Sequence, residues 1–190
     1  QLLQPDQPVL HALVWLEQLL RSSPWWAVVA VTVVIAWLVS RRIVLSLAMG
    51  ALLCVIGVLG LWDAGMQTLA LMIMAAGLSV VIGIPLGVLM ARVNWLRSIM
   101  LPVLDVMQNM PSFVYLIPVV MLFGLGKIPA IIATVIYAVP PLIRLTDLGI
   151  RLVDREVLEA SRAFGANPRQ QLFGVQLPLA LPNIMAGINQ

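Results

Sequence analysis

The sequence predicts an all-α fold, a polytopic transmembrane helical bundle. Of the 190 residues, 62% are hydrophobic and 10% are charged, and the mean hydropathy is +1.04. An ordinary soluble domain carries roughly 25% charged residues, so lipid is the natural solvent for most of this surface. The apolar runs approach the length needed to cross a bilayer, and backbone groups in lipid must bond within their own segment, which favours helices.

The N-terminal third contains one amphipathic segment and two apolar segments. Residues 1–23 place leucines at helical spacing. This pattern predicts an amphipathic helix that either lies on the membrane surface or packs on the rest of the protein. Residues 25–39 form the first expected span, and Trp25 and Trp26 suit the headgroup level. Residues 43–61 form the second expected span.

Four further apolar segments follow, at residues 66–90, 113–123, 128–143 and from Leu177 onward. We expect the first of them to be broken near Pro85, and residues 92–111 to form a polar connector. The next two are short, with Pro140 and Pro141 near the end of the second, and cross only with help from flanking residues or inside a protein-lined cavity. Because the last segment is cut at Gln190, we expect a chain truncated in its sixth span.

The basic residues predict the orientation of these spans. If the spans alternate, nine of the eleven Lys and Arg lie on one side. Cytoplasmic loops carry an excess of Lys and Arg, so residues 144–176 are expected in the cytoplasm and residues 1–23 outside. The nine residues are Arg41, Arg42, Arg92, Arg97, Arg144, Arg151, Arg155, Arg162 and Arg169.

The composition excludes several classes of function. The basic residues form no run longer than Arg41-Arg42, which argues against a nucleic-acid partner. Cys54 is the only cysteine and His11 the only histidine, so a disulfide framework and a His/Cys metal site are excluded. The sequence contains no P-loop motif for ATP. No catalytic residue is assigned, and an enzyme is the least favoured class.

The only long polar stretch, residues 144–176, has the pattern of a short helix. Asp154 is placed to cap its N-terminus, and Glu156 adds favourable charge to the first turn. Gly165 suits the position after the helix, where positive φ is needed. The expected helix gathers apolar and small side chains on one face, at Val157, Leu158, Ser161 and Phe164.

A second short helix is expected after that turn. Asn167 and Pro168 have the residue types of an N-cap and a first helical position, and Leu177-Pro178 is expected to end the helix. An amphipathic helix that protrudes from a membrane can press into a groove on a soluble partner. The alternative is a solvated connector without a partner.

A motif in this loop resembles one in a known family. Glu159-Ala160-Ser161 is followed after three residues by Gly165 and after nine more by Val175-Gln176-Leu177-Pro178. The spacing is similar to the E-A-A, G, I-x-L-P motif of bacterial ABC-importer permeases, with Ser161 and Val175 as mild departures. The resemblance implies a type I ABC-importer permease fold.

The resemblance also implies a role and partners. In that family the loop is a coupling helix that docks in a cleft of a separate ATPase subunit, which binds ATP and Mg. The other implied partners are a second permease copy, an extracytoplasmic substrate-binding protein and the lipid of a bacterial inner membrane. The implied organisation is an N-terminal region, 1–65, with two extra transmembrane helices, and an incomplete permease core, 66–190. The implied coupling residues are Glu159, Ala160, Ser161, Phe164, Gly165, Leu177 and Pro178.

A narrower resemblance concerns the cargo. The stretch Leu104-Asp105-x-x-Gln108-x-x-Pro111-x-Phe113-Val114-Tyr115-Leu116-x-Pro118 is similar to the glycine betaine/proline betaine permeases, as is Ile143-Arg144-Leu145-Thr146. It implies import of a quaternary amine osmoprotectant, with choline and carnitine as related cargo. In this family affinity is largely delegated to the binding protein, so no tight site is expected in the chain.

Several residues are candidates for a translocation path or gate. A carboxylate beside an apolar span is costly unless it is paired, exposed or functional, and aromatic faces attract quaternary ammonium groups. The alternatives are a solvated connector face, helix-packing aromatics and, for Arg144, a charge anchor at the membrane boundary. Two other functions stay open: an importer of another small solute such as an amino acid, and a channel or structural membrane protein without an ATPase. The candidates are Asp105, Gln108, Pro111, Phe113, Tyr115 and Tyr137.

Overall fold

The computed structural model describes residues 8–190, which form helices without a strand in that range. The predicted all-α, polytopic helical fold is confirmed. Contacts divide the chain into two compact units, residues 1–74 and residues 75–190. Helix α4, Trp62–Arg92, begins in the first unit and ends in the second. The predicted division after residue 65 also falls within α4 and stays a prediction.

The first unit contains three helices before α4, namely α1 Pro8–Ser22, α2 Trp25–Ser40 and α3 Ile43–Val58. The first two meet at 106°, and α2 packs against α3. Gly50 permits this packing, because a Cβ there would lie 2.6 Å from Val33 Cγ2. Arg21 Nε donates to the Asp63 carboxylate at 3.0 Å, which ties α1 to the start of α4. Residues 1–7 of the predicted amphipathic segment lie outside the described residues.

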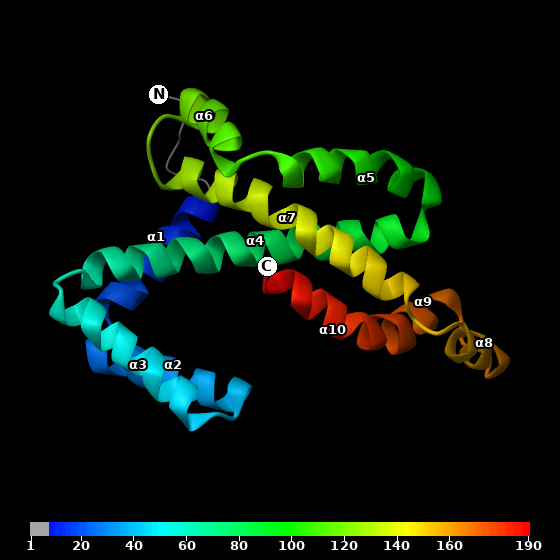
Figure 1. Cartoon of the computed structure of the whole chain (residues 1–190), viewed down its shortest axis with the longest axis horizontal. Coiled ribbons are helices and arrows are strands. Elements are labelled where there is room, and N and C mark those ends of the chain that lie inside the picture. The colour runs from blue at the N-terminus through cyan, green and yellow to red at the C-terminus, as the bar shows by residue number, and fades with distance from the viewer. Residues whose placement is uncertain (1–7) are drawn as a thin grey trace. The chain divides into compact units, whose positions relative to one another are not determined.

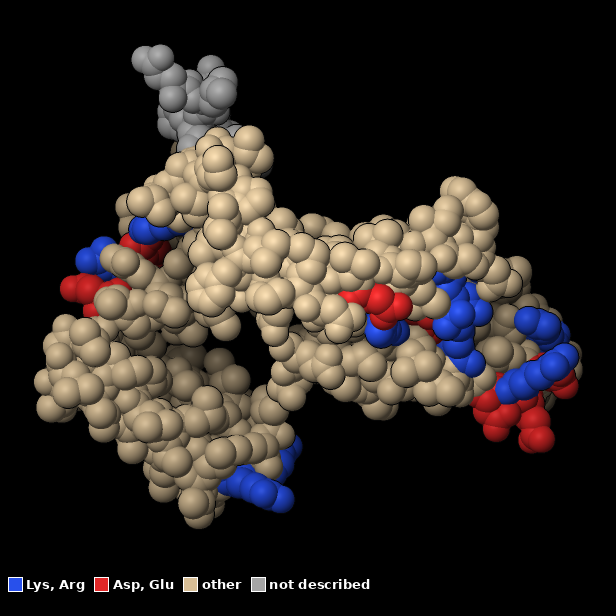
Figure 2. Space-filling view, turned by 45° about the horizontal axis from the view of Figure 1, so that its top comes forward, with Lys and Arg blue, Asp and Glu red and all other residues tan. Residues whose placement is uncertain are grey.

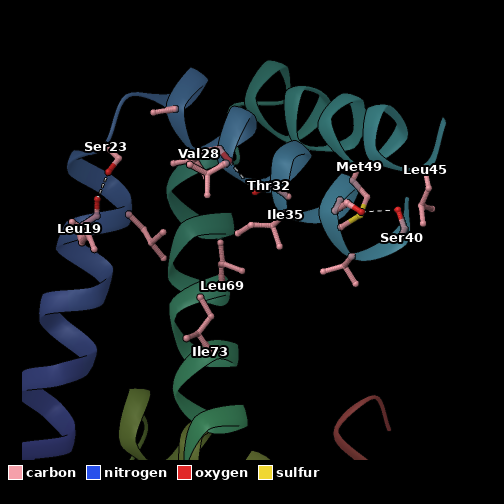
Figure 3. Close-up of a pocket in the computed structure, with 15 residues that line it drawn as sticks. Leu19, Ser23, Val28, Thr32, Ile35, Ser40, Leu45, Met49, Leu69 and Ile73 are labelled. Carbon is pink, nitrogen blue, oxygen red and sulfur yellow. Dashed lines mark hydrogen bonds between the residues drawn. The ribbon is translucent and has the colours of Figure 1, made fainter. Parts of the chain in front are cut away.

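A groove of about 700 Å³ lies within this first unit (Figure 3). Leu69 and Ile73 of α4 line it together with aliphatic side chains of α1, α2 and α3. Its hydroxyl groups are already used, because Ser23 donates to Leu19 O at 2.6 Å and Thr32 donates to Val28 O at 2.9 Å. The lining of the groove is therefore mostly aliphatic, and these hydroxyl groups already donate to backbone carbonyls instead of to a charged solute.

The second unit is built around one long helix. In addition to the end of α4 it contains α5 Asn94–Asn109, α6 Ser112–Phe123, α7 Lys127–Arg151, α8 Arg155–Ala163, α9 Pro168–Gln171, a π-helical turn Leu172–Gln176 and α10 Leu177–Ile188. Figure 1 shows α7 between α5 and α10, and it packs against both as well as against α6.

Two apolar clusters fix α7 in this position. One joins Met90 of α4, Leu104 of α5 and Ile143 of α7. The other joins Leu142 of α7 to Ile184 of α10. Helix α4 contributes to both clusters, through Met90 in the first and through Ile84 and Val88 in the second, so α4, α5, α7 and α10 share one apolar core.

Several helices are long and apolar enough to cross a membrane. In the part of the chain that the structure describes, three single helices qualify: Trp62–Arg92, Lys127–Arg151 and the continuous helix Pro168–Ile188. Two bent pairs, α1 with α2 and α5 with α6, bent by 106° and 94°, raise the number to five if each is one span. Helix α3 is a shorter apolar helix. A multi-pass membrane protein is confirmed.

Two predictions about proline were wrong. Helix α4 runs unbroken through Pro85, and α7 runs through Pro140 and Pro141 to Arg151. The predicted connector 92–111 is also mostly helical, as α5. Neighbouring helices and local adjustments satisfy the backbone groups that a proline leaves free in a membrane helix. The polar stretch 144–176 therefore begins inside α7 instead of in a loop.

The predicted helix end at Leu177-Pro178 was also wrong. The π-helical turn Leu172–Gln176 joins α9 directly to α10, and Leu177 N bonds to Leu172 O. A wider turn relieves the clash that a proline ring makes with the carbonyl four residues before it, so the helix continues past Pro178. The short segment that holds α8 therefore lies between α7 and the continuous helix Pro168–Ile188.

Candidate functional site

Helix α8 forms as its sequence predicts. Asp154 is the N-cap, and its carboxylate accepts from Glu156 N at 2.9 Å. Gly165 follows the helix with φ +82°, a conformation that side chains other than glycine rarely adopt. Asn167 then accepts from the backbone N–H groups of Arg169 and Gln170, which completes a capping box for α9. Local hydrogen bonds therefore define both ends of the protruding segment.

A buried glutamine joins α8 to α9. Gln171 is 7% exposed, and its Nε2 donates to Leu158 O and to Ser161 Oγ, both at 2.9 Å. Ser161 Oγ in turn donates to Leu158 O at 2.8 Å. Two turns of α8 are thus fixed to the start of the helix that leads into α10.

The predicted coupling residues occupy three different environments. Glu159, Ala160, Phe164 and Gly165 are exposed around the end of α8, and Glu159 pairs with Arg155 at 3.1 Å. Ser161 points toward α9, through the bond from Gln171 described above. Leu177 packs on the apolar cluster of α7 and α10, whereas Pro178 is exposed at the start of α10.

The end of α8 presents an apolar side chain to its surroundings. Phe164 is 93% exposed, and Phe173 in the π-helical turn is 68% exposed. Figure 2 shows acidic and basic side chains gathered at the end of the molecule where α8 and α9 lie, while most of the remaining visible surface is uncharged. An exposed phenyl ring bordered by charged groups is typical of a surface that docks on another protein.

The predicted path residues lie on α5, α6 and α7. Asp105 and Gln108 are exposed and one turn apart on α5, and Pro111 caps the start of α6. Tyr115 Oη donates to Met107 O at 2.6 Å, which closes the bend between α5 and α6. The two remaining aromatic candidates, Phe113 and Tyr137, are 71% and 54% exposed.

An ion pair connects α5 to α7 among these residues. The Arg144 guanidinium, predicted as a boundary anchor, donates to the Asp105 carboxylate. The side chains are 35% and 56% exposed. The Asn109 side chain donates to the backbone carbonyl of Asp105 at 2.7 Å. Both side chains of the pair are therefore partly accessible to solvent.

A second, buried group of charges was missed by the sequence analysis. Asp147 of α7 is 2% exposed and accepts from Arg97 Nε at 3.0 Å and from Arg151 Nε at 2.8 Å. Arg151 also donates to Met90 O at 3.1 Å and to Asn94 Oδ1 at 3.0 Å. We call Arg97, Asp147, Arg151 and Asn94 the Asp147 cluster.

The sequence held one signal for this cluster. Asp147 and Arg151 are four residues apart, a spacing that places opposite charges on one helix face. That signal required α7 to extend past Ile143, and the two prolines before it argued against such an extension. The partner Arg97 lies fifty residues away in sequence and gave no local signal.

Close helix packing supports the same region. A Cβ on Gly87 of α4 would lie 2.5 Å from Thr146 Cβ and 2.8 Å from Ile143 O of α7. A Cβ on Gly149 would lie 2.8 Å from Asn183 Cβ of α10. Small residues at both positions let the three backbones approach closely, as in other membrane helix pairs.

The described residues hold no group of three His, Cys, Asp or Glu side chains arranged for a metal ion. The carboxylates of Asp105, Asp147 and Glu159 each form an ion pair with at least one arginine. The arrangement offers an exposed docking helix, a buried ion cluster and an accessible ion pair.

Comparison with known proteins agrees with this description. The family described as "Binding-protein-dependent transport system inner membrane component" matches residues 83–189. The glycine betaine/proline betaine transport system permease protein ProW of Escherichia coli (strain K12) is 49% identical over 183 residues, covering 96% of this chain and 51% of that protein.

Two relatives from other bacteria are similarly close. The glycine betaine transport system permease protein OpuAB of Bacillus subtilis (strain 168) is 47% identical, over 81% of this chain and 54% of that protein. The glycine betaine/carnitine transport permease protein GbuB of Listeria monocytogenes is 50% identical, over 72% of this chain and 50% of that protein. The chain spans about half the length of these curated relatives.

Proposed function

Because the chain belongs to the family of binding-protein-dependent transport system inner membrane components, we propose that it is part of the permease subunit of an ATP-driven importer of glycine betaine, proline betaine or a related quaternary amine. The single observation that carries this proposal is the capped, exposed helix α8 at the position of the family's E-A-A motif. A helix of this kind passes force from an ATPase to the spanning helices.

The docking surface consists of the exposed part of α8. Glu159, Ala160, Phe164 and Gly165 contact the ATPase, and Phe164 is the apolar anchor because its ring is 93% exposed. Ser161 and Leu177 support the surface from within, since they face α9 and the α7–α10 cluster. ATP and Mg are bound by the ATPase subunit and not by this chain.

The cargo is proposed from the relatives and from chemistry. Glycine betaine, proline betaine and carnitine, the solutes in the relatives' names, all carry a quaternary ammonium and a carboxylate. Such an ammonium has no N–H group and is attracted by carboxylates and aromatic faces. Asp105, Gln108, Pro111, Phe113, Tyr115 and Tyr137 line the proposed path, and an extracytoplasmic binding protein supplies the affinity.

The proposed assembly contains two permease copies and two ATPase subunits in a bacterial inner membrane. The positive-inside count supports a cytoplasmic α8 and an external N-terminal segment, because nine of eleven basic residues fall on the α8 side of alternating spans. Alternating access then follows from rocking of rigid groups of helices around a central path.

The first experiment tests coupling. Gly165→Pro removes the positive φ that ends α8, and Glu159→Lys reverses a charge on its exposed face. Each change is expected to reduce ATP-driven uptake of labelled glycine betaine while the permease still inserts. Lys127→Gln, a charge change on the opposite predicted side, is the control. Wild-type uptake in both α8 variants at normal expression would refute the coupling role.

The second experiment separates the alternatives. Cells that express the permease with its ATPase and binding protein are given labelled glycine betaine, carnitine or methionine. Preferred uptake of methionine would favour an amino-acid importer. Passage that does not depend on ATP would favour a channel. Modification of a cysteine placed at Ala160 from outside the cell would overturn the orientation.

A further inference from the structure

We propose that Asp147 is a positioning residue that fastens the loop-side ends of α4, α5 and α7 together, so that they move as one body when α8 is displaced. This inference rests on the proposed function. Asp147 does not contact cargo or ATPase in it. Instead, hydrogen bonds that are joined through short stretches of helix lead from α8 to the Asp147 cluster, and each of these bonds is present in the structure.

The first step joins α8 to α9. Gln171 is almost fully buried and donates to Leu158 O and Ser161 Oγ of α8. A buried amide that lost these acceptors would pay the desolvation penalty of an unsatisfied polar group. Displacement of α8 therefore carries α9 with it.

The second step joins α9 to the end of α4. Arg92, the last residue of α4, donates from its guanidinium to Pro168 O at 2.9 Å. Pro168 opens α9 within its capping box, so its carbonyl is held in place. A charged donor makes this bond stronger than an amide–carbonyl bond.

The third step joins α4, α5 and α7. Arg151 of α7 reaches Met90 O near the end of α4 and Asn94 Oδ1 at the start of α5. The same guanidinium donates to Asp147, which also holds Arg97 of α5. One carboxylate, 2% exposed, is thus the acceptor on which two arginines from two helices converge.

A role in transmission explains why the region uses charge. The apolar clusters already pack α7 against α4, α5 and α10. A buried ion cluster adds little net stability over apolar side chains of similar volume, but its hydrogen bonds define one geometry and resist sliding. A rigid joint of this kind suits a part of the protein that must pass a displacement onward.

The experiment uses the permease that contains this chain, assembled in proteoliposomes with its ATPase and binding protein. Asp147→Asn keeps the shape and removes the charge. Arg92→Gln cuts the link at an exposed residue, so it folds even if the first variant does not. Asp63→Asn, which removes an exposed carboxylate paired with Arg21 at 3.0 Å, is the matched control. The readouts are assembled complex, basal ATP hydrolysis, stimulation by loaded binding protein, and uptake per assembled complex.

We expect Asp147→Asn to keep basal ATP hydrolysis and to lose about tenfold in stimulation and in uptake per assembled complex. Arg92→Gln is expected to lose several-fold, Asp147→Glu to recover part of the loss, and Asp63→Asn to match the wild type. Uptake per assembled complex at the wild-type level in both Asp147→Asn and Arg92→Gln would overturn the inference. A loss of total uptake that is explained entirely by a smaller amount of assembled complex would also overturn the inference. A wild-type complex that fails to take up any quaternary amine would instead overturn the proposed function.

Discussion

Two ion contacts join α5 to α7, and they differ in the burial of the carboxylate and in the number of its partners, while the arginine side chains are 31–39% exposed in both. Asp147 is buried, accepts from two arginines and belongs to a network that includes α4. Asp105 has a side chain that is 56% exposed and pairs with Arg144 alone. Buried pairs are costly to break, whereas exposed pairs contribute little and exchange readily with water or another ion. One helix pair thus has a fixed joint and a contact that can open.

Within the proposed importer, we expect the two contacts to behave differently. The joint near α8 would stay closed while force passes through it. The contact between Asp105 and Arg144 would open when a zwitterionic solute offers its own charges to them. Four sets of substitutions test this difference between the two contacts, from the largest expected effect to the smallest.

The largest expected effect is on stability at the buried joint. Asp147→Ala leaves Arg97 and Arg151 without their shared acceptor and is expected to cost about 3 kcal/mol. Asp105→Ala is expected to cost less than about 1 kcal/mol, because its side chain is solvated. Thermal unfolding of the detergent-purified protein measures both. Equal decreases in Tm for Asp147→Ala and Asp105→Ala would contradict the expected difference in stability between the two contacts.

The second effect concerns the close approach of α4 that places Met90 beside Arg151. Gly87→Ala forces a methyl group against Thr146 and the Ile143 carbonyl, and is expected to destabilise by about 2 kcal/mol. Gly77→Ala is the matched control on the same helix, since a Cβ there meets nothing within 4 Å. Replacement of a glycine within a helix by alanine is expected to stabilise the Gly77→Ala variant by up to about 1 kcal/mol. A control as unstable as Gly87→Ala would contradict the packing argument.

The third test exchanges the charges of each pair. Asp105→Arg with Arg144→Asp keeps a one-to-one pair and is expected to cost about 1 kcal/mol or less relative to the wild type. The double variant Asp147→Arg with Arg151→Asp is not expected to regain wild-type stability or uptake, because Arg151 also donates hydrogen bonds to Met90 O and to Asn94 Oδ1. Uptake and Tm of single and double variants give the coupling energies. Full recovery at the buried site would show that it is an ordinary pair.

The smallest effect lies at the start of α9. Asn167→Ala removes the acceptor for the N–H groups of Arg169 and Gln170, at 3.0 and 2.8 Å, and is expected to weaken the local helix by about 1 kcal/mol. Faster hydrogen exchange is expected in α8 and α9 but not around Asp105. Exchange that rises equally around Asp105 and in α8 and α9 would show that the two contacts are not independent.

Local features of the site were predictable from sequence. Asp154, Gly165 and Asn167 each act on backbone groups within three residues, so the residue types alone determine the caps. The apolar runs likewise predicted most of the helices, because a bilayer requires a certain length of apolar chain.

Features that depend on distant contacts were not predictable. Pro140 and Pro141 predicted an end that α7 does not have, because packing against α4, α5 and α10 outweighs the local penalty. The same misplaced end hid Asp147 among loop residues. Its burial depends on Arg97, which a pattern within one helix does not reveal.

The π-helical turn Leu172–Gln176 has a consequence for how this protein tolerates changes in length. A wide turn holds one residue more than an α-helical turn of similar rise. Deletion of Gly174, which is exposed, would convert the turn to regular helix and bring the Pro178 ring against the carbonyl four residues before it, so a kink is expected there. Deletion of a residue within α10 would instead rotate everything after it by about 100° and carry Ile184 out of its cluster. Deletions are therefore expected to disturb the structure at both places, by a kink at the turn and by a rotation within α10.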